Sequence, residues 1–367
     1  MQLKQVARDA LLKPLQAVSG IVERRQTLPI LANVLLEQRD GRLFVTATDL
    51  EMQITANSEL ASKQDQSVTV GARKLQDLLR ALPEETPINV DTAAGKMTVR
   101  AGRSRFNLQT LPAGDYPRIG LSQEQLQTIA LPQRDFRGLL KLAEFAMAQQ
   151  DIRYYLNGML LVIDKGSLQA VATDGHRLSY ASIAVPGDYS RQEVILPRKT
   201  VLELGKLLED IDAELTIDVL ANQVRFRFSN IELVSKVVDG KFPDYNRVIP
   251  SGHPKQLELS RSELLQALQR AAILSNEKFR GVRLVLGTDQ LKIICTNSEQ
   301  EEAEEEIEVA YKGEALDIGF NITYLLDVLH NLAAEHVVLA LGDANSSALI
   351  TMPERSDYKY VVMPMRI

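Results

Sequence analysis

The hydrophobic and polar residues of the chain follow two different periods. In six segments the apolar residues recur three and four positions apart, which is the spacing of one helix face and predicts six amphipathic helices. These segments cover residues 7–20, 72–82, 133–149, 197–208, 260–276 and 321–332. The first, third and fifth of them open with an Asp or a Ser, so we expect a side-chain cap at the start of each.

Between the helical segments lie short apolar runs that are joined by polar turns. Three pairs of runs begin at Asn33, Gly158 and Gly281, and an Asp, Gly or Lys turn separates the two runs of each pair. That pattern is typical of a β-hairpin. Further strands are expected in 95–111 and 222–238. Helices on one face of an antiparallel sheet make this an α+β fold.

The same order of elements occurs three times along the chain. The stretch GRLFVTATDLE matches GSLQAVATDGH, 125 positions later, and DQLKIICTNSE, a further 123 positions on. In each stretch a Thr is followed directly by an Asp or an Asn. Because order, spacing and identities recur together, we predict three related domains, each with two helices on an antiparallel sheet. The predicted domains are 1–124, 125–252 and 253–367.

Composition places the chain among ordinary globular proteins. Hydrophobic residues make up 45% and charged residues 25% of it. Cys295 is the single cysteine, so no disulfide forms within the chain and a reducing compartment is expected. No run approaches the roughly 20 apolar residues that span a bilayer, and the N-terminus lacks a signal-peptide pattern. We therefore expect a soluble, cytoplasmic protein with no membrane partner.

The charge of the chain is unevenly distributed. The formal net charge is −6, yet the six helical segments and their flanks sum to +8, which leaves −14 for the rest. Basic helices suit a surface that faces a polyanion, and because few aromatic residues interleave with the basic ones, base stacking is not expected to be the main mode of contact. The pattern favours contact with the backbone of duplex DNA without reading its sequence, although charged helix faces are commonly just solvated.

An acidic run and a basic run lie at opposite ends of the chain. The run EQEEAEEEIE at 299–308 holds seven glutamates, and VRAGRSRF at 99–106 holds three arginines. A solvated acidic strand is the ordinary interpretation of such a run. The alternative is that the acidic third domain contacts the basic first domain of a second copy, and such a head-to-tail contact can close into a ring.

The sequence was also searched for catalytic groups. It contains no phosphate-binding glycine loop, no nucleophile elbow, and no zinc-ligand spacing among its four histidines and one cysteine, so neither metal nor cofactor is expected. Asp174 and His176 are the remaining candidate pair. Asp174 recurs as Asp49 and Asn297, which indicates a turn residue rather than a catalytic one. A hydrolase using Asp174 and His176, and a repeat scaffold that binds only proteins, stay as alternatives.

Several stretches together resemble the bacterial DNA polymerase III beta subunits, the sliding clamps. They run through the whole chain and include TLPILANVLL, QDIRYYLNGML, VATDGHRLS, KVVDGKFPDYNRVIP, NSEQEEAEE and YVVMPMRI. The resemblance implies a head-to-tail homodimeric ring of six domains, with twelve helices lining a hole that encircles duplex DNA. Such a ring is no enzyme: it slides and makes the polymerase processive.

The resemblance also implies three sets of site residues. A peptide-binding pocket would receive motifs of replicative and translesion DNA polymerases, the clamp loader, and mismatch-repair and other clamp-binding proteins. Its residues are Leu156, Thr173, Gly175, His176, Arg177, Leu178, Pro243, Arg247, Val248, Val361, Val362, Met363, Pro364, Met365 and Arg366. The DNA-contacting residues are Arg25, Gln150, Tyr154, Tyr155 and Lys199. The dimer interface comprises Lys74, Arg103, Arg105, Phe106, Ile273, Leu274, Glu299, Glu301, Glu302, Glu304 and Glu305.

Overall fold

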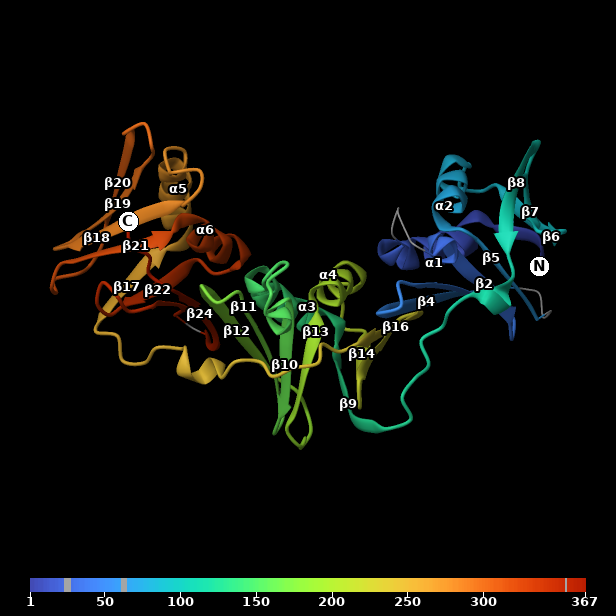
Figure 1. Cartoon of the computed structure of the whole chain (residues 1–367), viewed down its shortest axis with the longest axis horizontal. Coiled ribbons are helices and arrows are strands. Elements are labelled where there is room, and N and C mark those ends of the chain that lie inside the picture. The colour runs from blue at the N-terminus through green and yellow to red at the C-terminus, as the bar shows by residue number, and fades with distance from the viewer. Residues whose placement is uncertain (23–27, 61–64, 354) are drawn as a thin grey trace. The chain divides into compact units, whose positions relative to one another are not determined.

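The computed structural model describes residues 1–22, 28–60, 65–353 and 355–367 (Figure 1). The chain forms two compact units, and each is described by itself. The first comprises Met1–Arg134 and Glu203–Val237, and the second comprises Asp135–Leu202 and Val238–Ile367. No helix among the described residues has the length and apolarity that crossing a membrane requires.

The six predicted helices are present in the described chain. They are α1 (Arg8–Val18), α2 (Ala72–Ala81), α3 (Gln133–Ala143), α4 (Arg198–Leu207), α5 (Arg261–Ala272) and α6 (Ile322–Asn331). Short 3-10 turns cover Ser19–Ile21, Pro29–Ala32, Ala113–Asp115, Glu144–Ala146, Tyr154–Leu156 and Tyr245–Arg247. Sequence periodicity was sufficient to predict these helices because each of them buries one apolar stripe, such as Leu11, Leu15 and Val18 of α1.

The predicted caps are correct for only one of the three helices. The Ser260 hydroxyl caps α5 by accepting a hydrogen bond from the Glu263 amide (3.4 Å). The prediction is wrong for α1, whose cap position is Ala7, and for α3, where Asp135 lies inside the first turn. In both cases the residue before the helix ends a strand and has no side-chain acceptor, being Ala7 or Pro132, and the carboxylate acts within the first turn.

The twelve described strands of the first unit belong to one antiparallel sheet. In spatial order they are β1 (Gln2–Ala7), β6 (Pro87–Ala93), β7 (Lys96–Ala101), β8 (Ser104–Leu111), β5 (Gln66–Gly71), β2 (Asn33–Arg39), β3 (Arg42–Thr48), β4 (Met52–Glu59), β16 (Ile231–Lys236), β15 (Gln223–Phe228), β14 (Glu214–Leu220) and β9 (Gln125–Pro132). The predicted hairpin at Asn33 is β2 and β3. The sheet continues across a predicted domain boundary, because β4 pairs with β16.

The described strands of the second unit form two antiparallel sheets. The larger one has the order β13 (Gln192–Pro197), β10 (Gly158–Asp164), β11 (Ser167–Thr173), β12 (Arg177–Ala184), β24 (Arg355–Val362), β23 (Ala348–Met352), β22 (His336–Leu341) and β17 (Lys255–Ser260). The smaller one has the order β20 (Glu302–Glu308), β19 (Gln290–Thr296), β18 (Gly281–Gly287) and β21 (Leu316–Asn321). The other two predicted hairpins are β10 with β11 and β18 with β19.

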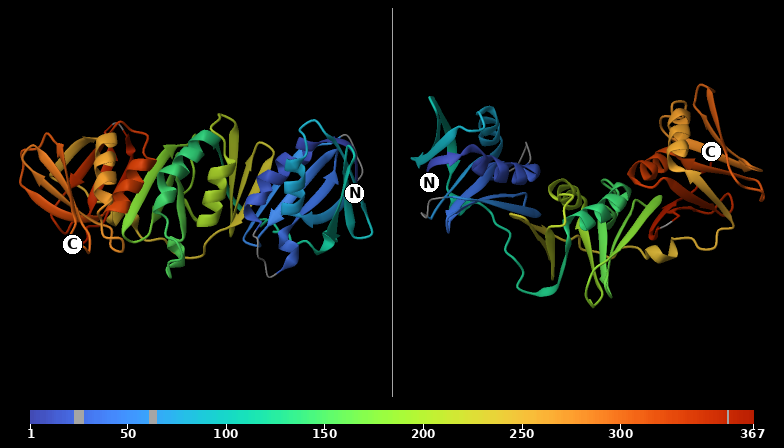
Figure 2. Two further views of the ribbon diagram at one scale, coloured as in Figure 1. Left: turned by 90° about the horizontal axis from the view of Figure 1, so that it is seen from above. Right: turned by 180° about the vertical axis from the view of Figure 1, so that it is seen from behind.

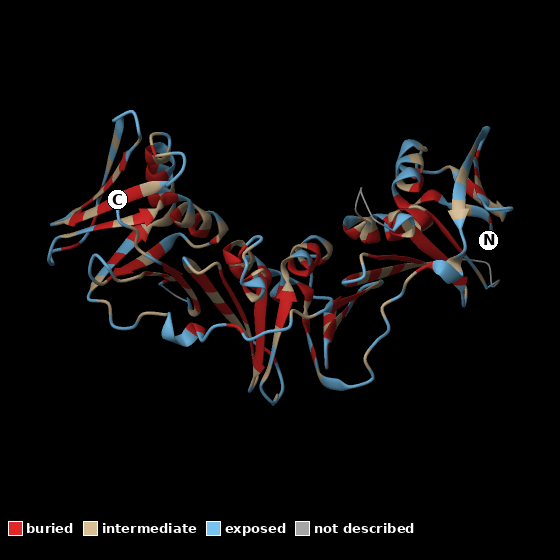
Figure 3. Ribbon diagram, viewed as in Figure 1, coloured by how far each residue is buried: buried red, intermediate tan, exposed pale blue. Residues whose placement is uncertain are grey.

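The core of the first unit lies between the helices and the face of the sheet that they cover (Figure 2). Figure 3 shows buried residues on the strands beneath α1, and α1 contacts β3, β4 and α2. Pro14 inside α1 cannot donate a hydrogen bond to the Ala10 carbonyl. The Ser58 hydroxyl of β4 donates to that carbonyl instead (2.6 Å). The sheet thus satisfies the group that the proline frees, and the helix continues.

The recurrent Asp or Asn after each hairpin strand has the structural role that the sequence indicated. Asp49 accepts from the Glu51 and Met52 amides (3.0 and 2.8 Å), and Asp174 accepts from the His176 and Arg177 amides (2.9 and 3.0 Å). Asn297 accepts in the same way from the amides of two residues that follow it, both at 3.0 Å. The turn chemistry is therefore shared by all three repeats.

Candidate functional site

A cavity of about 190 Å³ opens in the second unit, beside the turn that joins β11 to β12. Three further segments complete it: the loop before β10, the segment around Tyr245, and the end of β24. Its lining residues are Arg153, Tyr155, Leu156, Thr173, Gly175, His176, Arg177, Leu178, Phe242, Pro243, Tyr245, Val248, Val361 and Met363. Most of them are apolar, so the cavity suits apolar side chains of a ligand.

The floor of this pocket is part of the hydrophobic core. Leu156, Leu178, Phe242, Tyr245 and Val361 are each at most 7% exposed and belong to one buried cluster that continues beneath β10 and β11. Leu178 of β12 and Val361 of β24 are direct cross-strand partners. Because both strands are held in a sheet, the floor is preformed and a ligand does not have to order it.

Ten of the fifteen predicted pocket residues line this cavity, and five lie elsewhere. Val362 is fully buried on the opposite face of β24 from Val361, since side chains alternate along a strand. Arg247 extends into solvent and pairs with Asp244 (3.0 Å). Pro364, Met365 and Arg366 lie further along the tail, beyond the cavity wall.

Four lining residues were not assigned to the pocket by sequence reasoning. They are Arg153, Tyr155, Phe242 and Tyr245. Phe242 and Tyr245 flank the predicted Pro243, so extending that segment by two residues on either side would have included both. Tyr155 was expected to contact DNA, and the structure places it on the pocket wall.

Arg153 reaches the rim of the pocket because an ion pair holds it there. Its guanidinium donates to both oxygens of Asp151 (3.0 and 2.9 Å) and to the Asp174 carbonyl (3.3 Å). These hydrogen bonds hold the pKa of Asp151 at about 2. A methyl group on Gly175, whose φ is +89°, would lie 2.9 Å from the Arg153 guanidinium. The absence of a side chain at Gly175 therefore makes room for this cation.

His176 lies at the junction of the turn and the C-terminal segment. Its ring stacks on Tyr324 of α6, with centroids 6.5 Å apart. Its carbonyl accepts a hydrogen bond from the Met363 amide (2.8 Å). The neighbouring Asp174 carboxylate is occupied by backbone amides and by Arg177, so it is not arranged to take a proton from His176.

Arg177 connects the pocket to α6 instead of offering its charge to a ligand. Its guanidinium donates to Asp174 (3.1 Å), to Asp327 of α6 and to the Phe145 carbonyl (2.7 Å), and it lies 4.5 Å from the centre of the Tyr324 ring. Burial opposes the charge, but the Tyr360 hydroxyl and the two carboxylates hold the pKa of Arg177 above its ordinary value. Arg177 also neutralises Asp327, the one acidic residue of the 321–330 segment.

Replacing Arg177 by Met is expected to destabilise the second unit. Asp174 and Asp327 would lose their common partner in a site where the arginine side chain is only 10% exposed. We expect a loss of roughly 2 to 3 kcal/mol, seen as a lower calorimetric unfolding temperature. Arg191→Met is the matched control, because Arg191 pairs with Asp164 and Glu193 at the surface and its loss should cost less than about 1 kcal/mol. Equal effects of the two substitutions would contradict the role of Arg177.

Family comparisons cover nearly the whole chain. Models described as the N-terminal, central and C-terminal domains of the DNA polymerase III beta subunit match residues 1–120, 130–244 and 246–366. The chain belongs to the DNA polymerase III beta subunit family, the sliding clamps. It is thus a non-catalytic processivity factor, and the hydrolase and scaffold alternatives are not favoured.

Curated and solved relatives agree with this family. The chain is 49% identical to the Beta sliding clamp of Pseudomonas putida KT2440 and 47% identical to that of Escherichia coli K12, over 99% of each chain. A crystal structure of the Pseudomonas aeruginosa beta subunit has a TM-score of 0.96 at 47% identity, and covers 100% of both chains. A second structure from that organism, bound to griselimycin, has a TM-score of 0.95 at 47% identity over the same coverage.

The positions expected to contact DNA in this sliding clamp fall on two described elements. Gln150 and Tyr154 are exposed on the loop before β10, and Tyr154 packs edge-on against Tyr155. Lys199 is exposed in the first turn of α4. Arg25 lies outside the described residues. Ile152 is 96% exposed beside Gln150 and Tyr154, and no sequence pattern marked it.

Most of the positions expected at the dimer interface lie on or just before two strands, β8 and β20, each of which has an accessible edge. Among the described residues, β8 is paired with β7 along most of its length but with β5 only through Thr110 and Leu111. β20 is the outermost strand of the four-stranded sheet. On β8 and its preceding turn, Arg103 and Arg105 are exposed and Phe106 is half-buried.

The acidic strand β20 has the solvent-exposed character that a charge run usually has. Glu299, Glu301, Glu302 and Glu304 are exposed, and Glu305 is half-buried. Glu304 pairs with Lys292 (2.7 Å) and Glu305 with Arg270 (2.6 Å). Ile273 is 78% exposed at the end of α5, and the half-buried Leu274 follows it, so both lie just past the helix in which they were expected. Lys74 is exposed on α2.

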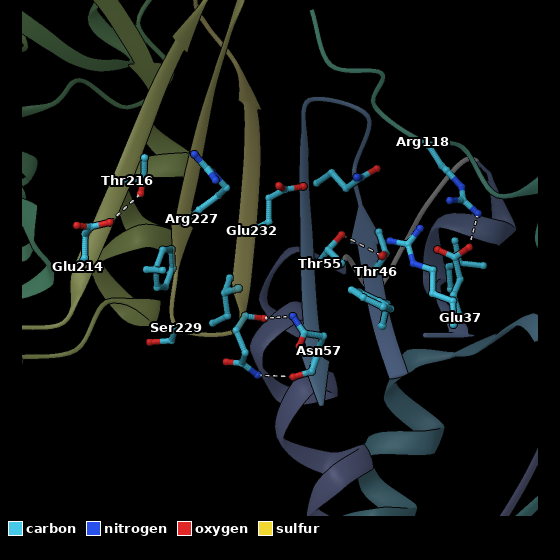
Figure 4. Close-up of a pocket in the computed structure, with 17 residues that line it drawn as sticks. Glu37, Thr46, Thr55, Asn57, Arg118, Glu214, Thr216, Arg227, Ser229 and Glu232 are labelled. Carbon is cyan, nitrogen blue, oxygen red and sulfur yellow. Dashed lines mark hydrogen bonds and ion pairs between the residues drawn. The ribbon is translucent and has the colours of Figure 1, made fainter. Parts of the chain in front are cut away.

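A second, larger cavity in the first unit has a different character. It measures about 520 Å³ and lies over the strands on either side of the β4–β16 pairing (Figure 4). Its polar groups bind one another: Arg118 pairs with Glu37 (2.8 Å), and Thr46 and Thr55 share a hydrogen bond (3.0 Å). Because these groups are engaged and few apolar side chains reach the surface, the pocket beside Gly175 is the better candidate for an apolar ligand.

Proposed function

We propose that this sliding clamp acts as a head-to-tail homodimeric ring that encloses duplex DNA without reading its sequence. The observation that carries the proposal is the pair of accessible strand edges, basic at β8 and acidic at β20. Antiparallel pairing of β8 with β20 of a second copy would give partners to backbone groups on both edges. Two such contacts, related by a twofold axis, close a ring.

The side chains on the two edges support the same pairing. Arg103 and Arg105 would face Glu299, Glu301 and Glu302 of the partner subunit, which favours this orientation over pairing of like edges. The half-buried Phe106 would cover the exposed Ile273 and its neighbour Leu274. Apolar burial would supply affinity and the charges would select the partner strand.

The charge segregation supports a sliding rather than a tightly bound ring. Enclosure keeps the protein on DNA by topology, so only weak attraction to phosphates is needed. The helical segments sum to +8 over the chain, and Arg177 pairs with Asp327, the one acidic residue of the 321–330 segment. Gln150, Tyr154 and Lys199 offer polar contacts that do not discriminate between base pairs.

The pocket beside Gly175 is proposed to recruit the clamp's partners. Replicative and translesion DNA polymerases, the clamp loader and mismatch-repair proteins would each insert apolar side chains of a short motif, while Arg153 and His176 orient it. The preformed apolar floor and the adaptable Met363 support this role. Griselimycin is bound to the P. aeruginosa relative in one of the solved structures, so it is a suitable probe. The cytoplasm is the proposed compartment.

Retention on circular DNA tests the ring. Clamp loaded onto a nicked circular plasmid should co-elute with it in gel filtration, and cutting the plasmid once should release nearly all of it, because a ring can slide off a free end. Blocking the cut ends with biotin and streptavidin should restore retention. Equal retention on open linear and circular DNA would refute topological enclosure.

A further inference from the structure

The last five residues of the chain cross between the two sheets of the second unit. β24 ends at Val362 beside β12 in the eight-stranded sheet. The Met363 amide then donates to the His176 carbonyl (2.8 Å), and the Met365 amide donates to the Gly319 carbonyl of β21 (2.8 Å). Two backbone hydrogen bonds thus hold the segment that continues the pocket wall.

The side chain of Ile367 lies where β18 and β21 carry no side chain. A methyl group on Gly319 would lie 2.7 Å from Cδ1 of Ile367, and one on Gly281 would lie 3.1 Å from the same atom. Gly319 is the cross-strand partner of Arg283, two residues beyond Gly281, so both glycines present the same face of the sheet. Together they form a seat for a branched aliphatic side chain.

We propose that Ile367, held on Gly281 and Gly319, is a positioning residue that orders the C-terminal wall of the pocket and thereby raises its affinity. This inference rests on the proposed function of the pocket. Ile367 does not line the cavity, and Met363 does. A chain terminus frays unless it is tied down, and a wall that is ordered for only a fraction of the time lowers the apparent affinity by that fraction.

The two glycines have unequal roles in this arrangement. A methyl group on Gly319 would also lie 2.5 Å from the carbonyl oxygen of Met365, so an alanine there displaces both the tail backbone and Ile367. A methyl group on Gly281 meets only the end of the Ile367 side chain, which can shift by a few tenths of an ångström. Gly319→Ala should therefore weaken the anchor more than Gly281→Ala.

Griselimycin binding to the full-length clamp, measured by titration calorimetry, tests the proposal. We expect affinity to fall about tenfold for Gly319→Ala and about three- to tenfold for Ile367→Ala, while Ile367→Leu restores it. Gly287→Ala is the matched control, because Gly287 also lies in β18 and a methyl group there meets no atom within 4 Å. The affinity of this variant for griselimycin should equal that of the parent. The double variant Gly319→Ala, Ile367→Ala should bind no more weakly than Gly319→Ala alone, because both act through one contact.

Hydrogen exchange of the Met363 and Met365 amides tests the anchor without any ligand. Both amides should exchange faster in Gly319→Ala and Ile367→Ala, and at the parent rate in Gly287→Ala and Ile367→Leu. If the Met363 and Met365 amides of Ile367→Ala exchange at the parent rate, the proposal is overturned. It is also overturned if these amides exchange faster while the affinity of the variant for griselimycin is unchanged. If the parent protein itself does not bind griselimycin, the proposed ligand class of the pocket is wrong, and the exchange rates alone decide whether the anchor exists.

Discussion

Replacing Ile273 by Lys is expected to separate the proposed ring into monomers. Ile273 is 78% exposed in the single chain, and the proposed interface buries it against the partner subunit's Phe106. A lysine there would place a charge in an apolar contact and next to the partner's Arg103 and Arg105. Burying a charged group beside like charges costs several kcal/mol. The dissociation constant of the dimer should therefore rise about a hundredfold or more.

Sedimentation measures this effect directly. The parent protein should sediment at about twice the chain mass of 40.9 kDa, and the Ile273→Lys variant should approach 40.9 kDa at micromolar concentration. The variant should also be lost from circular DNA. Ile152→Lys is the matched control, since Ile152 is 96% exposed in the same unit but lies outside the proposed interface. A dimeric Ile273→Lys protein would contradict the placement of the interface.

Deleting Met363–Ile367 is expected to abolish ligand binding at the pocket. The deletion removes the Met363 side chain from the wall and both backbone hydrogen bonds of the tail. It leaves Val361 in place, paired with Leu178, so the floor of the pocket should survive. We expect griselimycin affinity to fall by about a hundredfold or more, which corresponds to roughly 3 kcal/mol.

The oligomeric state should not change with this deletion. The proposed interface residues lie on β8, on β20 and at the end of α5, and the deleted segment crosses to β21 at the other edge of the four-stranded sheet. Sedimentation at the dimer mass, together with lost griselimycin binding, is the expected result. Monomers would place the tail in the interface, and unchanged binding would remove the C-terminus from the pocket.

Local sequence patterns predicted the elements of this protein well. Helix faces, hairpin runs and the recurrent Asp49, Asp174 and Asn297 depend on neighbours only a few residues away, so their physical chemistry is readable along the chain. The caps of α1 and α3 were predicted wrongly for the same local reason. The strands that run into these two helices end in Ala7 and Pro132, which carry no side-chain acceptor, whereas β17 ends in Ser260, which caps α5.

The roles of pocket residues were less accessible from sequence, as Arg177 and Tyr155 illustrate. Arg177 was predicted to be a pocket residue and does line the cavity, but its donors are used by Asp174, by Asp327 and by a carbonyl 32 residues earlier in the chain. Tyr155 stays a predicted DNA contact, and the fold also brings it to the wall of the cavity, which the sequence did not indicate. Whether a polar group faces a ligand or a buried partner depends on residues that only the folded chain brings near.

The sequence by itself therefore determined the threefold repeat, the six helices, the hairpins and the segregation of charge, because each arises from short-range periodicity or from counting. Only the tertiary structure decided that β12 pairs with β24, and this pairing places Leu178 beside Val361 and makes one pocket from distant segments. It also decided that Ile367 lies on Gly281 and Gly319. Such long-range contacts are selected by the free energy of packing the whole unit, and no local pattern records them.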